Sequence, residues 1–259
     1  MADFLLITVC HRQVEAETIW SVEKLHQMCS HDFTWVISSG DALIGRGRSR
    51  NATFFILEGK TPYLIFLDSD IMFQPEDIER LYSSLKAGYD LIGGVYSVKS
   101  GHQLAHYGLE GRIALDGTIK EVKYLSTGFM GISRVLLERM VRELDLPMCH
   151  ENEPRFRCYP FFENSRYKDS QGWIYISEDW DFCNKAREIG VKPYLDTSIR
   201  LWHKGDRIYT AEDVEAYEVQ LAQKEKEKQD MEEGYKAMAE REIEEGAESP
   251  LPENLKGGY

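Results

Sequence analysis

The sequence predicts an α/β fold in which helices flank a mostly parallel central sheet. In the first hundred residues, short apolar runs of strand length alternate with segments whose apolar residues recur at helical spacing. Turn-forming residues separate the two kinds of segment; Pro75, for example, opens a helical segment that Gly88 ends. Strands that alternate with helices are typical of a parallel sheet covered by helices.

The first half of the chain is predicted to contain four strands and three helices. Residues 3–10 predict a buried strand, and residues 33–41 predict a second strand closed by a Ser-Ser-Gly-Asp turn. Between them, residues 14–29 predict a helix, because four apolar residues fall near helical spacing: Val14, Ile19, Val22 and Leu25. The remaining elements are a helix core at 51–57, a strand at 63–67, the helix that begins at Pro75 and a strand at 89–97.

The second half is less regular. Residues 101–127 predict a hairpin around an Asp-Gly turn, whereas residues 145–176 are rich in aromatic side chains and have no clear period. The other predicted elements are helices at 131–144 and 179–190 and strands at 191–196 and 198–203. From residue 210 the chain is rich in helix-forming residues, which predicts a helical tail, and the last ten residues are expected to be disordered.

The net charge of −13 is concentrated in this tail. Residues 211–259 contain 15 acidic and 6 basic residues, a net charge of −9 that leaves only −4 for the residues before them. The body therefore lacks the basic balance of a general nucleic-acid binder. The sparse apolar stripe of the tail is a candidate surface for homo-oligomer formation.

Cysteine usage and the N-terminus predict the compartment. The five cysteines include no Cys-x-x-Cys pair, and the spacing of Cys149, His150 and Cys158 matches no closed zinc site, so reduced thiols are expected. The N-terminus has no basic region before its short apolar run, and no apolar stretch reaches the length of a membrane span. We therefore expect a cytoplasmic protein without a transmembrane segment.

Two carboxylates interrupt the apolar run LIFLDSDIMF at residues 64–73. Asp68 and Asp70 are two positions apart, which places both on the same side of an extended chain. They repel unless a cation binds between them, and the alternative is an aspartate turn that ends the strand in water. Because Mg²⁺ is usually held by one or two carboxylates together with substrate phosphates, the pair suits a metal–diphosphate site at the end of a strand.

More acidic residues occur where a late helix is predicted to begin. Glu178, Asp179 and Asp181 are candidates for N-terminal capping, but three acids exceed what a cap needs, so at least one is a candidate general base. His203 follows the last predicted strand, and a lone histidine is usually structural. If it faces the two strand-end aspartates, an imidazole and two carboxylates favour Mn²⁺ over Mg²⁺.

The segment GRGRSRN at residues 45–51 has two of the three glycines of a dinucleotide fingerprint and does not directly follow a strand. We expect a flexible loop that enters a helix. Its arginines, Arg46, Arg48 and Arg50, are candidates for contact with a diphosphate or a nucleobase edge, and the alternative is a solvated basic loop.

In this order, the motifs resemble those of the GT-A glycosyltransferases, in particular the large family that includes the inverting family 2 enzymes. The matching motifs are Asp68-Ser69-Asp70 after a central strand, Glu178-Asp179 at the start of a late helix, and His203. The resemblance extends over about residues 3–206 and is strongest at 46–73 and 126–140. The segment TVCHRQVEAET after the first strand departs from the donor loop of many members.

The resemblance implies a GT-A domain at 1–209, with a nucleotide-sugar-binding half at 1–100 and an acceptor half at 101–209, followed by the tail at 210–259. It also implies site residues. The implied metal ligands are Asp70, Asp68 and His203; the implied donor-binding residues are Asp41, Arg46, Arg48, Arg50, Asp68 and Ser69; and the implied acceptor-binding residues are Gly128, Phe129 and Trp180. Asp179 is expected to be the catalytic base and Glu178 an acceptor ligand, with Glu178 as base kept open.

The implied function is transfer of a sugar from a nucleoside-diphosphate sugar, with a UDP-sugar favoured, to a hydroxyl acceptor by a hexosyltransferase-type enzyme that uses Mn²⁺ or Mg²⁺. Inversion at the anomeric carbon is expected. Two alternatives remain. A nucleotidyltransferase of sugar phosphates usually has a glycine-rich loop after the first strand, which ITVCHRQV lacks. The second alternative is a catalytically inactive nucleotide-binding interaction module.

Overall fold

The computed structural model describes residues 2–170 and 172–247, so the end expected to be disordered lies outside the described residues. The chain divides into two compact units, Met1–Val214 and Glu215–Tyr259. The first unit holds the sheet and the candidate site, and the described residues of the second lie in helix α6 (Ala211–Ala247). Within the described ranges, no helix is both long and apolar enough to cross a membrane.

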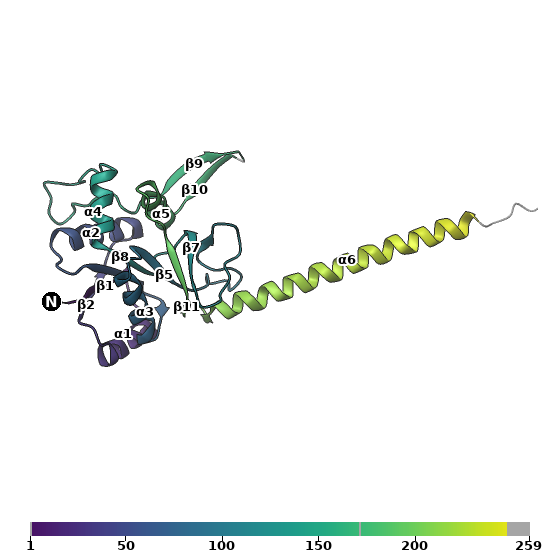
Figure 1. Ribbon diagram of the computed structural model, residues 1–259, viewed down its shortest axis with the longest axis horizontal. Coiled ribbons are helices and arrows are strands. Elements are labelled where there is room, and N and C mark those ends of the chain that lie inside the picture. Colours follow the sequence, from purple (N-terminus) through teal and green to yellow (C-terminus); the bar gives the residue numbers. More distant parts are fainter. Residues whose placement is uncertain (1, 171, 248–259) are drawn as a thin grey trace, which may run out of the picture. The chain divides into compact units, whose positions relative to one another are not determined.

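An eight-stranded mixed sheet forms the centre of the first unit (Figure 1). In spatial order its strands are β2 (Phe33–Ser39), β1 (Phe4–Cys10), β3 (Tyr63–Asp68), β8 (Phe129–Ser133), β5 (Leu91–Val95), β11 (Tyr194–Arg200), β7 (Ile119–Tyr124) and β6 (Tyr107–Gly108). Strands β2, β1, β3, β5 and β11 run in one direction, and β8 and β7 run against them. The predicted α/β class is confirmed.

Helices cover both faces of this sheet. On one face lie α1 (Ala16–Met28) and α3 (Pro75–Lys86), and on the other lie α2 (Ile44–Leu57), α4 (Arg134–Glu143) and α5 (Glu178–Glu188). Side chains of β1 alternate between the two cores: Phe4 and Leu6 pack with α1 and α3, and Leu5 and Ile7 pack with the other helices. A strand with both faces covered is apolar at nearly every position, which explains the apolar run of β1; its one polar side chain, Thr8, accepts a hydrogen bond from Trp35 Nε1 at 3.1 Å.

Strand β8 was not predicted. The sequence pattern suggested a helix from residue 131, but Phe129–Ser133 forms a buried strand that pairs antiparallel with β3 and β5. Helix α4 starts only after Ser133, whose Oγ accepts a hydrogen bond from the backbone N–H of Leu136 at 3.1 Å. A short apolar run has no period of its own, so its pairing with two neighbouring strands decides its conformation.

Three further segments refine the sequence interpretation. The aromatic-rich stretch contains a hairpin of β9 (Ser165–Asp169) and β10 (Gly172–Ile176), and the predicted hairpin at 101–127 is present as the antiparallel pair β6–β7. The strands expected at 191–196 and 198–203 are instead the single strand β11 followed by β12 (Trp202–Lys204). Strand β12 forms a small sheet with β13 (Ile208–Tyr209) and β4 (Ile71–Met72).

Candidate active site

The two acidic motifs lie at one edge of the central sheet. Asp68 is the last residue of β3, and Asp70 immediately precedes β4. Glu178 is the first residue of α5. Ligands of open α/β sheets bind beyond the carboxyl ends of the strands, which is where these side chains are found.

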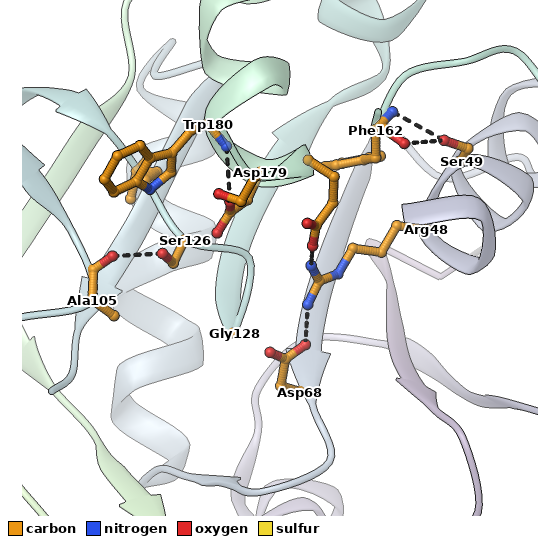
Figure 2. Close-up of polar contacts among 12 residues, drawn as sticks. Arg48, Ser49, Asp68, Ala105, Ser126, Gly128, Phe162, Asp179 and Trp180 are labelled. Carbon is orange, nitrogen blue, oxygen red and sulfur yellow. Dashed lines mark hydrogen bonds and ion pairs between the residues drawn. The ribbon is translucent and has the colours of Figure 1, made fainter. Parts of the chain in front are cut away.

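Arg48 of α2 joins the two motifs (Figure 2). Its Nη2 donates to Asp68 Oδ1 at 2.7 Å, and its Nη1 donates to Glu178 Oε1. The Arg48 side chain is only 6% exposed. Burial alone lowers the pKa of a guanidinium, but the adjacent carboxylates of Asp68 and Glu178 outweigh burial and raise the Arg48 pKa. Arg48 is therefore a buried cation that holds one carboxylate from each motif.

The three arginines of residues 45–51 contact different carboxylates: Arg48 contacts Asp68 and Glu178, whereas Arg46 and Arg50 contact Asp41. The predicted loop is wrong, because α2 already begins at Ile44 and Arg46, Arg48 and Arg50 are all helical. Positions four apart share one face of a helix, whereas a position two apart points to the other side. Arg46 Nε and Nη2 accordingly donate to Asp41 at 2.9 and 2.8 Å, and Arg50 Nη1 lies 3.6 Å from the same carboxylate. The hydrogen bonds from Arg46, above all, hold the Asp41 pKa below its ordinary value.

A pocket of about 590 Å³ lies beside Asp41. It is bounded by the end of β2 at Ser38, by α2 at Arg50 and by the segment that contains Arg155. Arg50 Nη2 donates to the backbone oxygen of Arg155 at 2.7 Å, so two residues that line the pocket are bonded to each other. The volume is in the range of small-molecule sites.

Asp70 belongs to a separate polar cluster. Lys99 Nζ donates to Asp70 Oδ2 at 2.5 Å, and His203 Nε2 lies 3.6 Å from Oδ1. His203 reaches this place because β12 pairs with β4, which sets His203 opposite Ile71. Burial raises the Asp70 pKa, but the contacts with His203 and Lys99 outweigh it and lower the pKa below its ordinary value. His203 Nδ1 lies 2.8 Å from the Ser97 backbone oxygen, so the ring lies between that carbonyl and the Asp70 carboxylate.

Glu178 and Asp179 are adjacent but have different surroundings. Burial, more than any neighbour, raises the Glu178 pKa, although Arg48 opposes this. Asp179 Oδ1 accepts hydrogen bonds from Ser177 Oγ and from the Trp180 backbone N–H, the latter at 2.9 Å. The other oxygen of Asp179 is directed away from α5 (Figure 2). Asp181, the third of the capping candidates, pairs with Lys185 Nζ at 2.8 Å.

Comparison with known proteins finds a family match for part of the chain. Residues 22–143 match the family described as Glycosyl transferase family 2, a segment that includes Asp41, the arginines of α2 and both aspartates of the strand-end motif. Residues 22–143, just under half of the chain, form a glycosyl transferase family 2 domain. The crystal structure of A197 from STIV has a similar fold, with a TM-score of 0.55 and 18% sequence identity over 81% of this chain and 91% of A197. No curated protein matches the chain in sequence.

Family 2 glycosyltransferases typically use a divalent metal, and the residues around Asp70 fit one. Asp70 Oδ1 and His203 Nε2 converge at the edge of the sheet, and Mg²⁺ or Mn²⁺ at a diphosphate needs only one or two carboxylates besides the phosphate oxygens. Asp68 is engaged by Arg48. In the described part of the chain, no three His, Cys, Asp or Glu side chains form a complete metal-binding group.

Gly128 links Asp68 to Tyr96. The backbone N–H of Gly128 donates to the Tyr96 hydroxyl at 2.9 Å, and its carbonyl accepts from the Asp68 N–H at 2.9 Å. A Cβ at residue 128 would lie 2.5 Å from the Tyr96 hydroxyl oxygen, so this close approach requires glycine. Burial, followed by the charges of Asp68 and Asp179, raises the Tyr96 pKa well above its ordinary value.

The other two residues expected on the acceptor side lie in different surroundings. Phe129 is fully buried and packs against Phe73 at a ring distance of 5.8 Å, so its side chain is part of the core beneath the site. Trp180 stacks on Tyr124, with ring centroids 4.4 Å apart and an interplanar angle of 6°. Trp180 is therefore part of an aromatic surface beside α5.

Sequence reasoning missed Tyr96 and Lys99. Both follow β5, whose carboxyl end lies at the same edge of the sheet as that of β3, so a search after every parallel strand would have found them. Ser69 was expected to bind the donor. Its backbone oxygen accepts from the Glu15 N–H at 2.8 Å, which ties the Asp-Ser-Asp turn to the start of α1.

Proposed function

We propose that this protein is a metal-dependent glycosyltransferase that moves a sugar from a nucleoside-diphosphate sugar, with a UDP-sugar favoured, to a hydroxyl acceptor. The observation that carries the proposal is the pair of contacts made by Arg48. They bring the Asp-Ser-Asp motif and the Glu-Asp motif into one site of a chain that has a family 2 domain. Sugar transfer needs donor and acceptor groups held in one geometry, which this arrangement supports.

The donor would be bound along the carboxyl edge of β2 and β3. Asp41 offers a carboxylate for the N–H groups of a nucleobase, and Arg46 and Arg50 offer guanidinium groups for phosphate. Asp68 and Ser69 are then placed for the ribose or the donor sugar. Lys99, next to Asp70, adds a positive charge that a diphosphate would meet.

Asp70 and His203 would hold Mn²⁺ or Mg²⁺, with Asp68 as a further candidate ligand. When bound, the metal neutralises charge that develops on the departing diphosphate. The His203 ring is oriented by Ser97, an arrangement typical of metal-ligating histidines, whose second nitrogen donates to a carbonyl.

Asp179 is proposed as the base. The acceptor oxygen forms a bond to the anomeric carbon while the bond from that carbon to the diphosphate oxygen breaks. The hydroxyl proton moves to the Asp179 carboxylate, and the electron pair of the broken bond leaves with the diphosphate. Asp179 suits this function because its hydrogen bonds from described residues end on Oδ1, whereas Glu178 is bound to Arg48. A single displacement of this kind inverts the anomeric carbon.

The deciding experiment is a screen of nucleotide sugars with and without Mn²⁺, in which release of nucleoside diphosphate is measured. Metal-dependent release from one donor, with UDP-sugars expected, supports the proposal. A sugar-phosphate nucleotidyltransferase would instead release pyrophosphate from a nucleoside triphosphate. An inactive binding module would show a higher melting temperature with nucleoside diphosphate and Mn²⁺ but no turnover of any donor.

A further inference from the structure

The β9–β10 hairpin has two chemically different faces. Its strands pair so that Trp173 lies opposite Lys168 and Tyr175 lies opposite Arg166. Because side chains alternate along a strand and directly opposed residues share a face, these four side chains form one face. All four are exposed, whereas Tyr167, Ile174 and Ile176 of the alternate positions are partly or fully buried. We call Arg166, Lys168, Trp173 and Tyr175 the outer face.

The outer face exposes two large aromatic side chains. Trp173 is 69% exposed and Tyr175 is 71% exposed. The Arg166 guanidinium lies 5.5 Å from the centre of the Trp173 ring, so a cation and an aromatic ring already form a common surface. Single exposed apolar residues are normal, but two aromatic rings on one face of a two-stranded hairpin indicate a binding surface.

The hairpin is attached to the acceptor side of the candidate site. Strand β10 ends at Ile176, and Glu178 and Asp179 follow directly as the first residues of α5 (Figure 1). Three residues of extended chain span at most about 10 Å, so Tyr175 lies close to Glu178. On its other face, the hairpin contacts the domain through Tyr167. Burial, followed by this contact with Tyr167, raises the pKa of Tyr124 to about 12. Tyr124 in turn stacks on Trp180.

We propose that the outer face binds an acidic oligosaccharide chain whose terminal hydroxyl is the acceptor. This inference rests on the proposed function and specifies its acceptor. The flat apolar face of a sugar ring packs on an aromatic ring, and Trp173 and Tyr175 offer two such rings in a row. Arg166 and Lys168 alternate with them across the hairpin and pair with carboxylate, sulfate or phosphate groups of the chain.

Charge favours a saccharide over a nucleic acid as the occupant. A nucleic-acid site needs a broad basic surface, but residues 1–210 carry a net charge of −4. Two cations beside two aromatic rings fit a chain that has an occasional anionic group and apolar ring faces between them. A polymer with a negative charge on every unit would be repelled by the net negative charge of residues 1–210 beyond its contacts with Arg166 and Lys168.

The test uses the full chain and a glycan array that holds acidic and neutral oligosaccharides, probed without donor. The variants are Trp173→Ala with Tyr175→Ala, and Arg166→Gln with Lys168→Gln. The matched control is Trp20→Ala, because Trp20 of α1 is 66% exposed and lies outside the hairpin. Donor hydrolysis is measured in parallel for every variant, and circular dichroism checks that each one is folded.

We expect binding to acidic glycans, weakened about two- to tenfold for each aromatic ring removed and unchanged in the Trp20 variant. The Arg166/Lys168 variant should lose the preference for acidic over neutral glycans, and wild-type binding should weaken as salt is raised. Preference for neutral glycans, binding of single-stranded oligothymidylate instead of glycans, or equal binding by wild type and the aromatic variant would each overturn the inference. In those cases, intact donor hydrolysis would still support the proposed function. Absence of donor hydrolysis in the wild type would instead contradict the proposed function, whatever the glycan array shows.

Discussion

Arg48 and Asp68 form an ion pair of 2.7 Å between α2 and the end of β3, and the guanidinium in this pair is almost fully buried. The same guanidinium also binds Glu178 at the start of α5. One cation thus lies between two carboxylates that come from segments far apart in the chain. Within the described residues, its Nε is buried and has no hydrogen-bond partner, so the group is held by its two carboxylate contacts.

Replacing Arg48 by methionine should destabilise the fold strongly. Removing one partner of a buried ion pair typically costs about 3–5 kcal/mol, because the remaining charges stay buried without compensation. Urea unfolding followed by circular dichroism measures the change. Arg46→Met is the matched control; its side chain is 55% exposed and pairs with Asp41, so its midpoint should move far less. Equal midpoints for the two variants would show that Arg48 does not link the motifs in solution.

Asp179→Asn should lower turnover by roughly 10²–10⁴, the contribution of a general base, while donor and metal binding persist. Glu178→Gln should act mainly on the apparent affinity for the acceptor. Single-turnover kinetics with isothermal titration of the donor separates the two effects. Near-normal turnover of Asp179→Asn would assign the base to Glu178 or indicate a retaining mechanism, and the anomeric configuration of the product distinguishes these outcomes.

Asp70→Ala should abolish metal-dependent activity, and His203→Ala should raise the Mn²⁺ concentration needed for half-maximal activity. Both side chains lie at the proposed metal position, with His203 Nε2 3.6 Å from Asp70 Oδ1. Activity measured during a Mn²⁺ titration after treatment with EDTA reports both changes. His150→Ala, with a side chain that is 58% exposed, serves as the control histidine. Full activity of the wild type in excess EDTA would contradict a metal function for this cluster.

Asp70 should also make stability depend on pH. Its pKa is lower in the folded chain than its ordinary value, since His203 and Lys99 outweigh burial. A carboxyl of this kind stabilises the fold above its unfolded pKa and loses that contribution as the pH falls through the folded pKa. The unfolding free energy of wild type should therefore decline below about pH 4, and that of Asp70→Asn should decline less. Urea titrations across this range measure the two slopes; parallel curves would refute the assignment.

The greater part of the acidic tail should be dispensable for chemistry, but its first turn should not. Ala211 and Val214 are buried, and Asp213 accepts from the Thr210 N–H at 2.7 Å and from Arg207 at 2.9 Å. A chain that ends at Gln220 should keep donor hydrolysis and its melting temperature, whereas a chain that ends at Tyr209 should melt earlier. Loss of donor hydrolysis in the folded Gln220 variant would show that the tail takes part in the reaction.

The sequence by itself determined the class of fold and the positions of the acidic motifs. Continuous apolar runs predict strands covered on both faces, and the carboxylates that end such runs mark the edge where ligands bind. These signals are local: the strand that leads to Asp68 and the helix that begins beside Glu178 are visible within a few residues. The resemblance to family 2 glycosyltransferases rests on the same motifs, and the match over residues 22–143 confirms it.

Only the tertiary structure decided what these side chains contact. The extent of α2 turns Arg48 toward the acids and Arg46 toward Asp41, a division that the segment GRGRSRN does not reveal when it is taken as a loop. The pairing of β12 with β4 brings His203 to Asp70. Residues 129–133 form the strand β8 because they pair with both β3 and β5. The physical reason is common to all three. Pairing and burial between segments distant in sequence outweigh local preferences, and the local pattern of a segment does not show which distant segment it will pack against.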